Sequence, residues 1–215
     1  MSARENILAR IRTRQGRAAA PRDDEVAAVA AHVAAHPRSP RPRSDGDLAA
    51  RFRERALNLA TTVEDAATPA AVPAMVAQYL HSHRLPPTAV CWPALGTLDW
   101  AGSGITVAVR AARGDDPVGI TGAYCAIAET GTLMLLSGAQ TPATVSLLPE
   151  THIAVVSRSR IVAGMEEAWA LLRSEHGQLP RAVNFVSGPS RTADIEQTVT
   201  LGAHGPYRVH LILTP

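Results

Sequence analysis

The segment that decides the fold class is residues 152–172, HIAVVSRSRIVAGMEEAWALL. It opens with a short apolar run, His152–Val156, which is typical of a buried strand. A helical pattern follows, in which one face carries Met165, Ala168, Trp169 and Leu172. A strand that is apolar on both faces and is followed by a helix is typical of a parallel sheet. The segment therefore predicts an α/β fold.

Similar short apolar runs recur along the rest of the chain. We predict further strands over Thr88–Trp92, Ile105–Val109, Val118–Thr121, Thr132–Leu136, Ala182–Val186 and Arg208–Leu213. Helices are expected over about Asp47–Leu59 and Val72–His83. Because buried strands are interspersed with helices, we expect a mainly parallel sheet flanked by helices.

The N-terminal region has the pattern of two helices and a linker. Ser2 and Glu5 fit a capping box at the start of a first helix, and a second helix follows it. The stretch Pro37–Arg43 is too rich in proline to be helical and is typical of an exposed linker. We therefore predict an N-terminal helical extension over residues 1–45 and an α/β domain over residues 46–215.

Charge is unevenly distributed, although the net charge is only +2. Residues 1–60 hold 12 arginines against 7 acidic residues, whereas residues 61–215 hold 9 against 12. The basic region lacks interleaved aromatic residues and a known reader motif, so we expect no nucleic-acid partner. Its positive charge suits an acidic partner protein. With no apolar run of about 18 residues and a charged N-terminus, we expect a cytoplasmic protein with no membrane span.

Several common chemistries are excluded by composition. The chain contains no lysine, which rules out a GxxxxGK[ST] P-loop, a Schiff-base lysine and a Ser–Lys dyad. Cys91 and Cys125 are too few for a four-cysteine zinc or iron–sulfur centre. His32 and His36 lack the glutamate of an HExxH motif. We therefore predict no metal site in this chain, and no motif identifies a cofactor.

The first candidate functional segment is residues 126–133, AIAETGTL. Glu129 stands beside a Thr-Gly-Thr sequence between two apolar runs, so we expect it near the end of a buried strand at a tight turn. Desolvation at such a place can tune the pKa of a carboxyl group, as a nucleophile or base requires. A glutamate that only caps the turn is the alternative. The candidate ligand-binding residues here are Thr130, Gly131 and Thr132.

The second candidate segment combines residues 188–196, GPSRTADIE, with residues 202–206, GAHGP. It follows the predicted strand Ala182–Val186, and open α/β sheets bind ligands beyond the carboxyl ends of their strands. Ser190 or Thr192 can cap a short helix that Asp194 and Glu196 favour. The candidate ligand-binding residues are Gly188, Ser190, Arg191, Thr192, Asp194 and Gly205.

These two segments are expected to meet at one edge of the sheet. We predict that Glu129, Arg191 and His204 face one cleft that binds a small anionic ligand. The arginine fork would hold a carboxylate or phosphate. Glu129 and His204 would form the acid–base pair, because imidazole titrates near neutrality.

The chain resembles the LutC/YkgG family, also called the LUD-domain family, of bacterial lactate-utilisation proteins. The resemblance rests on Ala128–Thr132, on Leu148–Ile153, and above all on the PSRTADIE and GxHGP pair. The N-terminal ILARIR stretch, residues 7–12, is also similar to the start of the family. Tyr207, directly after His-Gly-Pro, stands where a more polar residue is expected.

The resemblance implies a fold similar to the NagB/RpiA/CoA-transferase-like superfamily. It also implies work alongside iron–sulfur proteins in the oxidation of L-lactate to pyruvate. In the CoA-transferase branch of the superfamily a glutamate is the nucleophile, and Glu129 is the residue here that matches it by fold-level analogy. The alternatives are a small-anion or nucleotide-binding regulatory module and a stand-alone acyl- or CoA-transferring enzyme.

Overall fold

The computed structural model describes residues 2–18, 20–38, 40–41, 46–193 and 198–215. The chain consists of two units, Met1–Arg43 and Ser44–Pro215. Within the described residues, no helix is both long enough and apolar enough to cross a membrane.

The N-terminal unit contains two helices, α1 (Ala3–Arg14) and α2 (Asp23–Ala35). The predicted capping box of α1 is confirmed. The N–H of Glu5 donates to Ser2 Oγ at 3.3 Å, and the N–H of Ser2 donates to the Glu5 carboxylate at 2.5 Å. None of the described residues in either helix is buried. Local caps rather than a core of their own therefore define these helices.

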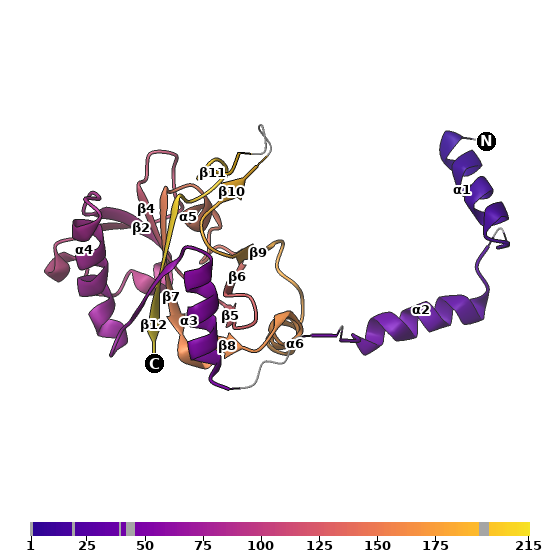
Figure 1. Cartoon of the computed structure of the whole chain (residues 1–215), viewed down its shortest axis with the longest axis horizontal. Coiled ribbons are helices and arrows are strands. Elements are labelled where there is room, and N and C mark those ends of the chain that lie inside the picture. The colour runs from indigo at the N-terminus through magenta and orange to yellow at the C-terminus, as the bar shows by residue number, and fades with distance from the viewer. Residues whose placement is uncertain (1, 19, 39, 42–45, 194–197) are drawn as a thin grey trace. The chain divides into compact units, whose positions relative to one another are not determined.

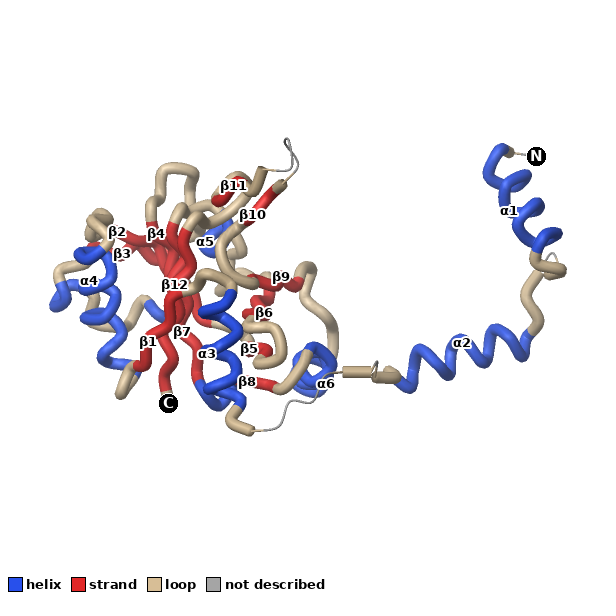
Figure 2. The backbone as a smooth tube through the Cα atoms, in the orientation of Figure 1, coloured by secondary structure: helices blue, strands red, loops and turns tan. Residues whose placement is uncertain are grey.

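A six-stranded sheet forms the centre of the C-terminal unit (Figure 2). Its strand order is β1-β12-β7-β4-β2-β3, and each neighbouring pair is parallel. The strands are β1 (Thr62–Asp65), β2 (Thr88–Cys91), β3 (Thr106–Val109), β4 (Val118–Gly122), β7 (Thr151–Ser157) and β12 (Arg208–Thr214). The predicted α/β class with a mainly parallel sheet is confirmed.

A second, four-stranded sheet has the order β8-β5-β6-β9. Its strands are β5 (Cys125–Ile127), β6 (Thr132–Leu136), β8 (Ile161–Val162) and β9 (Val183–Val186). The β5–β6 and β6–β9 pairs are antiparallel, and β5–β8 is parallel. Thr132–Leu136 and Ala182–Val186 were expected as strands, but they lie in this sheet rather than in the parallel one. Its two central strands, β5 and β6, are almost wholly buried, so they carry the same apolar pattern as the strands of the parallel sheet.

The layers of the C-terminal unit follow from which residues share a core (Figure 1). Helix α4 (Val72–Ser82) packs on one face of the parallel sheet. Helix α3 (Leu48–Asn58), the short helix α5 (Thr144–Leu147) and the second sheet pack on the other face. Helix α6 (Met165–Glu175) covers the far face of the second sheet. The 3-10 helices are η1 (Pro69–Ala71), η2 (Pro93–Leu95), η3 (Ala101–Ser103) and η4 (Arg158–Arg160).

A close approach of backbones fixes the position of α5 on the parallel sheet. A Cβ added at Gly119, in β4, would lie 1.9 Å from the carbonyl oxygen of Val145 in α5. Only a residue without a side chain therefore fits under this helix. The contact positions the end of α5, Leu147, and with it Leu148 at the amino-terminal edge of the sheet.

Candidate functional site

Glu129 lies at the tight turn between β5 and β6. As predicted, it directly follows a buried strand; it is half-buried, and its backbone N–H donates to Ala163 O at 3.0 Å. Gly131 has a φ of +67°, and a Cβ there would lie 2.6 Å from the backbone nitrogen of Ala56. The turn therefore requires glycine at this position, because both the backbone conformation and the close contact with α3 exclude a side chain.

The Thr-Gly-Thr turn meets the end of β9 through side-chain hydroxyls. Thr130 Oγ1 lies 2.8 Å from Thr132 Oγ1, which in turn lies 2.5 Å from Ser187 Oγ. Because β6 pairs with β9 with Leu133 opposite Val186, the end of one strand lies beside the start of the other. The two predicted segments are therefore brought together, and Ser187, which sequence reasoning missed, joins them. Its position directly after the predicted strand Ala182–Val186 was the available signal.

The physical reason that we gave for this meeting is wrong. The strand before Gly188, β9, belongs to the second sheet, and the loop Gly202–Pro206 precedes β12 at the amino end of the parallel sheet. Neither segment lies at the carboxyl edge of the parallel strands. Antiparallel pairing, rather than a common parallel edge, brings the segments together.

Backbone hydrogen bonds join the two halves of the second segment. Strands β10 (Arg191–Thr192) and β11 (Thr200–Leu201) pair antiparallel. The N–H of Ser190 donates to Pro206 O at 2.9 Å, and Ser190 O accepts from the N–H of Gly202 at 2.9 Å. The predicted cap at Ser190 is therefore wrong, because a strand follows it, whereas a helix capped by Thr192 would fall on residues 194–197, outside the described residues. Asp194 and Glu196 lie outside the described residues.

Arg191 and Gly188 both contact the C-terminal end of α3. The guanidinium of Arg191 donates from Nη2 to Leu59 O at 3.0 Å. A cation at this end of a helix is favoured by the helix dipole. Gly188 has a φ of +74°, and a Cβ there would lie 2.5 Å from the same oxygen. One of the five N–H groups of Arg191 thus has a structural role, and the side chain is otherwise exposed.

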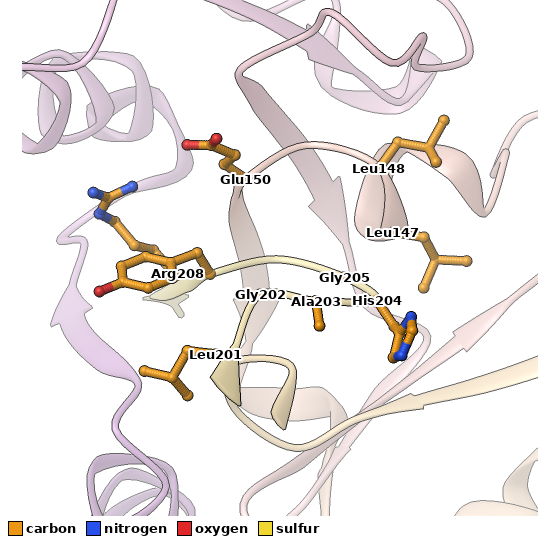
Figure 3. A pocket seen from close by; sticks show the side chains of 10 residues that line it. Leu147, Leu148, Glu150, Leu201, Gly202, Ala203, His204, Gly205 and Arg208 are labelled. Carbon is orange, nitrogen blue, oxygen red and sulfur yellow. The ribbon is translucent and has the colours of Figure 1, made fainter. Parts of the chain in front are cut away.

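A cavity of about 690 Å³ lies beside the loop Gly202–Gly205 (Figure 3). Its lining residues are Leu147, Leu148, Glu150, Leu201, Gly202, Ala203, His204, Gly205, Tyr207 and Arg208. Of the predicted site residues, His204 and Gly205 line it, whereas Glu129 and Arg191 are not among these residues. A single cleft shared by Glu129, Arg191 and His204 stays a prediction.

Strand pairing places a carboxylate and a guanidinium at this cavity that sequence reasoning missed. Glu150 immediately precedes β7, Arg208 begins β12, and the N–H of Arg208 donates to Glu150 O at 3.0 Å. The Arg208 guanidinium lies over the ring of Tyr207, 5.0 Å from its centre. Both charged residues stand at the start of a buried strand, which was the signal that could have identified them.

Two further histidines are buried in the core rather than exposed at a site. His152 Nε2 lies 2.7 Å from Thr121 Oγ1, and burial lowers the pKa of His152 to about 4. His210 Nδ1 lies 2.8 Å from Thr62 Oγ1, and burial together with nearby His83 lowers the pKa of His210 to about 4. Both imidazoles are therefore neutral at pH 7.

The two cysteines are also buried in the core. Burial raises the pKa of the Cys91 and Cys125 thiols to about 11. Both are therefore protonated at neutral pH and are weak nucleophiles. Among the described residues, no group of three or more His, Cys, Asp or Glu side chains is placed to hold a metal ion.

Comparison with known proteins gives one consistent result. Residues 100–214 match the family model described as the LUD domain. Two proteins called "Lactate utilization protein C", from Bacillus licheniformis and Bacillus subtilis, are 37% and 38% identical over 128 residues. Each alignment covers 57% of this chain and 52% of the relative. The chain thus spans about half the length of the curated relatives that it matches.

A solved structure with a similar fold has also been found. It is the crystal structure of a DUF162 family protein from Deinococcus radiodurans, with 26% sequence identity and a TM-score of 0.61. The similarity covers 81% of this chain and all of that one.

Proposed function

Because the chain belongs to the LUD domain family, we propose that it takes part in lactate utilisation, the role that the names of its curated relatives state. The observation that carries this proposal is the match to these relatives over more than half of the chain. The fold alone does not support it, because one fold can carry many different functions.

The finer proposal is that the chain acts with iron–sulfur proteins in the oxidation of L-lactate to pyruvate. This reaction removes two electrons and two protons from lactate, so it needs an electron acceptor. The two cysteines of this chain are both buried, in different core clusters, and too few to hold a four-cysteine cluster. Clusters on partner proteins would therefore accept the electrons.

Within that function, the loop pair Gly188–Thr192 and Thr200–Pro206 would bind the anionic substrate. His204 is an exposed imidazole at a cavity, which suits it to accept or donate a proton. Glu129 would act either as a nucleophile or base, or only as a residue that caps the turn. The structural support is the backbone pairing that holds Ser190 beside the His204 loop.

The pathway proposal is tested by deleting the gene in a host that has no other lactate dehydrogenase. The deletion strain is expected not to grow on L-lactate as the sole carbon source, and to grow normally on glucose. Complementation with the wild-type gene restores growth. Normal growth of the deletion strain on lactate would contradict the proposed function.

Site variants refine the same assay. His204→Gln is expected to restore growth poorly, whereas Glu129→Gln separates the two roles of Glu129. If that variant complements fully, the carboxylate is only part of the turn. His176→Gln, which changes an exposed histidine in the C-terminal unit outside the cavity, is the matched control and is expected to complement fully.

A further inference from the structure

The cavity beside His204 is lined by three polar side chains, Glu150 at the start of β7 and His204 and Arg208 in the segment that leads into β12; in Figure 3, Glu150 and Arg208 lie at one end of the cavity and His204 at the other. Arg208 offers a permanently charged donor fork, Glu150 offers a carboxylate acceptor, and His204 offers an imidazole. A carboxylate ligand needs the donors, and a neighbouring hydroxyl group on the same ligand needs an acceptor. The set is therefore suited to a molecule that carries both a carboxylate and a hydroxyl group.

The walls of the same cavity are apolar and exposed. Leu147, Leu148, Leu201 and Tyr207 are 40%, 50%, 40% and 47% exposed, respectively. Figure 3 shows Leu147 and Leu148 on one side of the Gly202–Gly205 loop and Leu201 on the other. Large apolar side chains gathered around a concave, polar site mark a place where an apolar group binds.

The size of the cavity is out of proportion to lactate. At about 690 Å³ it lies in the range of cavities that hold drug-sized ligands, about 300–1,000 Å³. A lactate with its carboxylate at Arg208 would fill a small part of this space. Its methyl group could not cover the leucines on both sides of the loop.

We infer that this cavity binds 2-hydroxy acids whose side chain is larger and more apolar than the methyl group of lactate. The carboxylate would bind Arg208, the hydroxyl group on the neighbouring carbon would donate to Glu150, and the side chain would contact Leu147, Leu148 and Leu201. This inference rests on the proposed function for the hydroxy-acid class and adds the nature of the side chain. It also assigns binding roles to Arg208 and Glu150.

The test is calorimetric titration of the full chain with L-phenyllactate, L-lactate and phenylpropionate, which lacks the hydroxyl group. L-phenyllactate is expected to bind at least about tenfold more tightly than lactate, because each apolar group that enters such a pocket adds to affinity. Phenylpropionate is expected to bind more weakly than L-phenyllactate, because Glu150 loses its hydroxyl partner.

Matched variants separate the two parts of the site. Leu148→Asn, which removes the apolar side chain without adding a charge, is expected to remove most of the preference for L-phenyllactate over L-lactate. Leu179→Asn changes an exposed leucine outside the cavity and is the control. Arg208→Gln is expected to weaken both ligands at least about tenfold. Arg113→Gln, at an exposed arginine outside the cavity, should leave both unchanged.

The outcomes distinguish this inference from the proposed function. Equal or tighter binding of lactate overturns the inference and leaves the pathway proposal intact. If neither hydroxy acid binds, the inference is also overturned, and the growth assay decides the proposed function separately. An unchanged preference in Leu148→Asn, with a thermal melting curve like that of the wild type, overturns the assignment of the apolar wall.

Discussion

Mild acid is expected to destabilise the C-terminal unit because two of its core histidines are held neutral. His152 and His210 have pKa values of about 4 in the folded chain, against an ordinary value of 6.5. Between these pH values the unfolded chain binds more protons than the folded chain, so the free energy of unfolding falls as the pH falls. A pH of 4.5 is two units below the pKa of 6.5 that an imidazole has in the unfolded chain. Each pH unit is worth 1.36 kcal/mol, and the folded imidazole also binds a small fraction of a proton at pH 4.5. Each histidine therefore lowers the free energy of unfolding by about 2.5 kcal/mol.

Urea unfolding at pH 7.5 and pH 4.5 measures this loss, which is expected to reach about 5 kcal/mol for the two histidines together. His210→Phe keeps a ring against Tyr79, with which His210 stacks at 4.1 Å, and should halve the loss. His81→Gln, at an exposed position of α4, is the control. Arg160 lowers the pKa of Glu175 to about 2, so that carboxylate stays charged across this range. The same loss in His210→Phe and in His81→Gln would refute the reasoning.

Two further changes test the supports of the site and the division of the chain. Gly188→Ala should lower the free energy of unfolding by about 1–3 kcal/mol, because the alanine must adopt a positive φ and its Cβ collides with Leu59 O. Urea unfolding measures this loss. Gly177→Ala, which has open space around it, is the control and should change little. Truncation before Asp47 should leave a folded C-terminal unit, because no described residue of α1 or α2 is buried. Thermal melting tests this, and loss of cooperative unfolding would contradict it. Binding to the proposed iron–sulfur partners should weaken, and the affinity of the full chain should fall with salt.

Local patterns were enough to predict most elements but not how they are distributed between the two sheets. The helix expected over about Asp47–Leu59 is α3, which Asp47 caps, and Thr132–Leu136 forms a strand with the expected bounds. That strand nevertheless belongs to the second sheet. It is covered by α6 on one face and by the parallel sheet on the other, so it is apolar throughout and its sequence looks like that of a parallel strand. The apolar composition of a strand indicates that both of its faces are buried. Which strand it pairs with, and whether the pair is parallel, depends on contacts between residues that are distant in the sequence.

One edge strand of the parallel sheet, β1, escaped prediction, whereas the other, β3, was expected over Ile105–Val109. Thr62–Asp65 forms β1 at the edge of the parallel sheet, and only Val63 of its four residues is buried. It pairs through backbone hydrogen bonds with His210–Leu213 of β12, and those residues lie far from it in the sequence. An exposed edge strand carries little side-chain signal of its own.

The candidate site shows the same limit at the level of single residues. Gly131 and Gly188 indicated turns, and both have a positive φ that favours glycine; that these loops bind a ligand stays a prediction. Glu150 and Arg208 became part of the cavity only because β7 pairs with β12 so that Thr151 lies opposite Arg208. That register is set by the apolar residues deeper in both strands, such as Ala154 opposite Leu211. The polar end of the cavity is therefore a consequence of core packing, so a change in the core of β7 or β12 would alter ligand binding without touching any residue that lines the cavity.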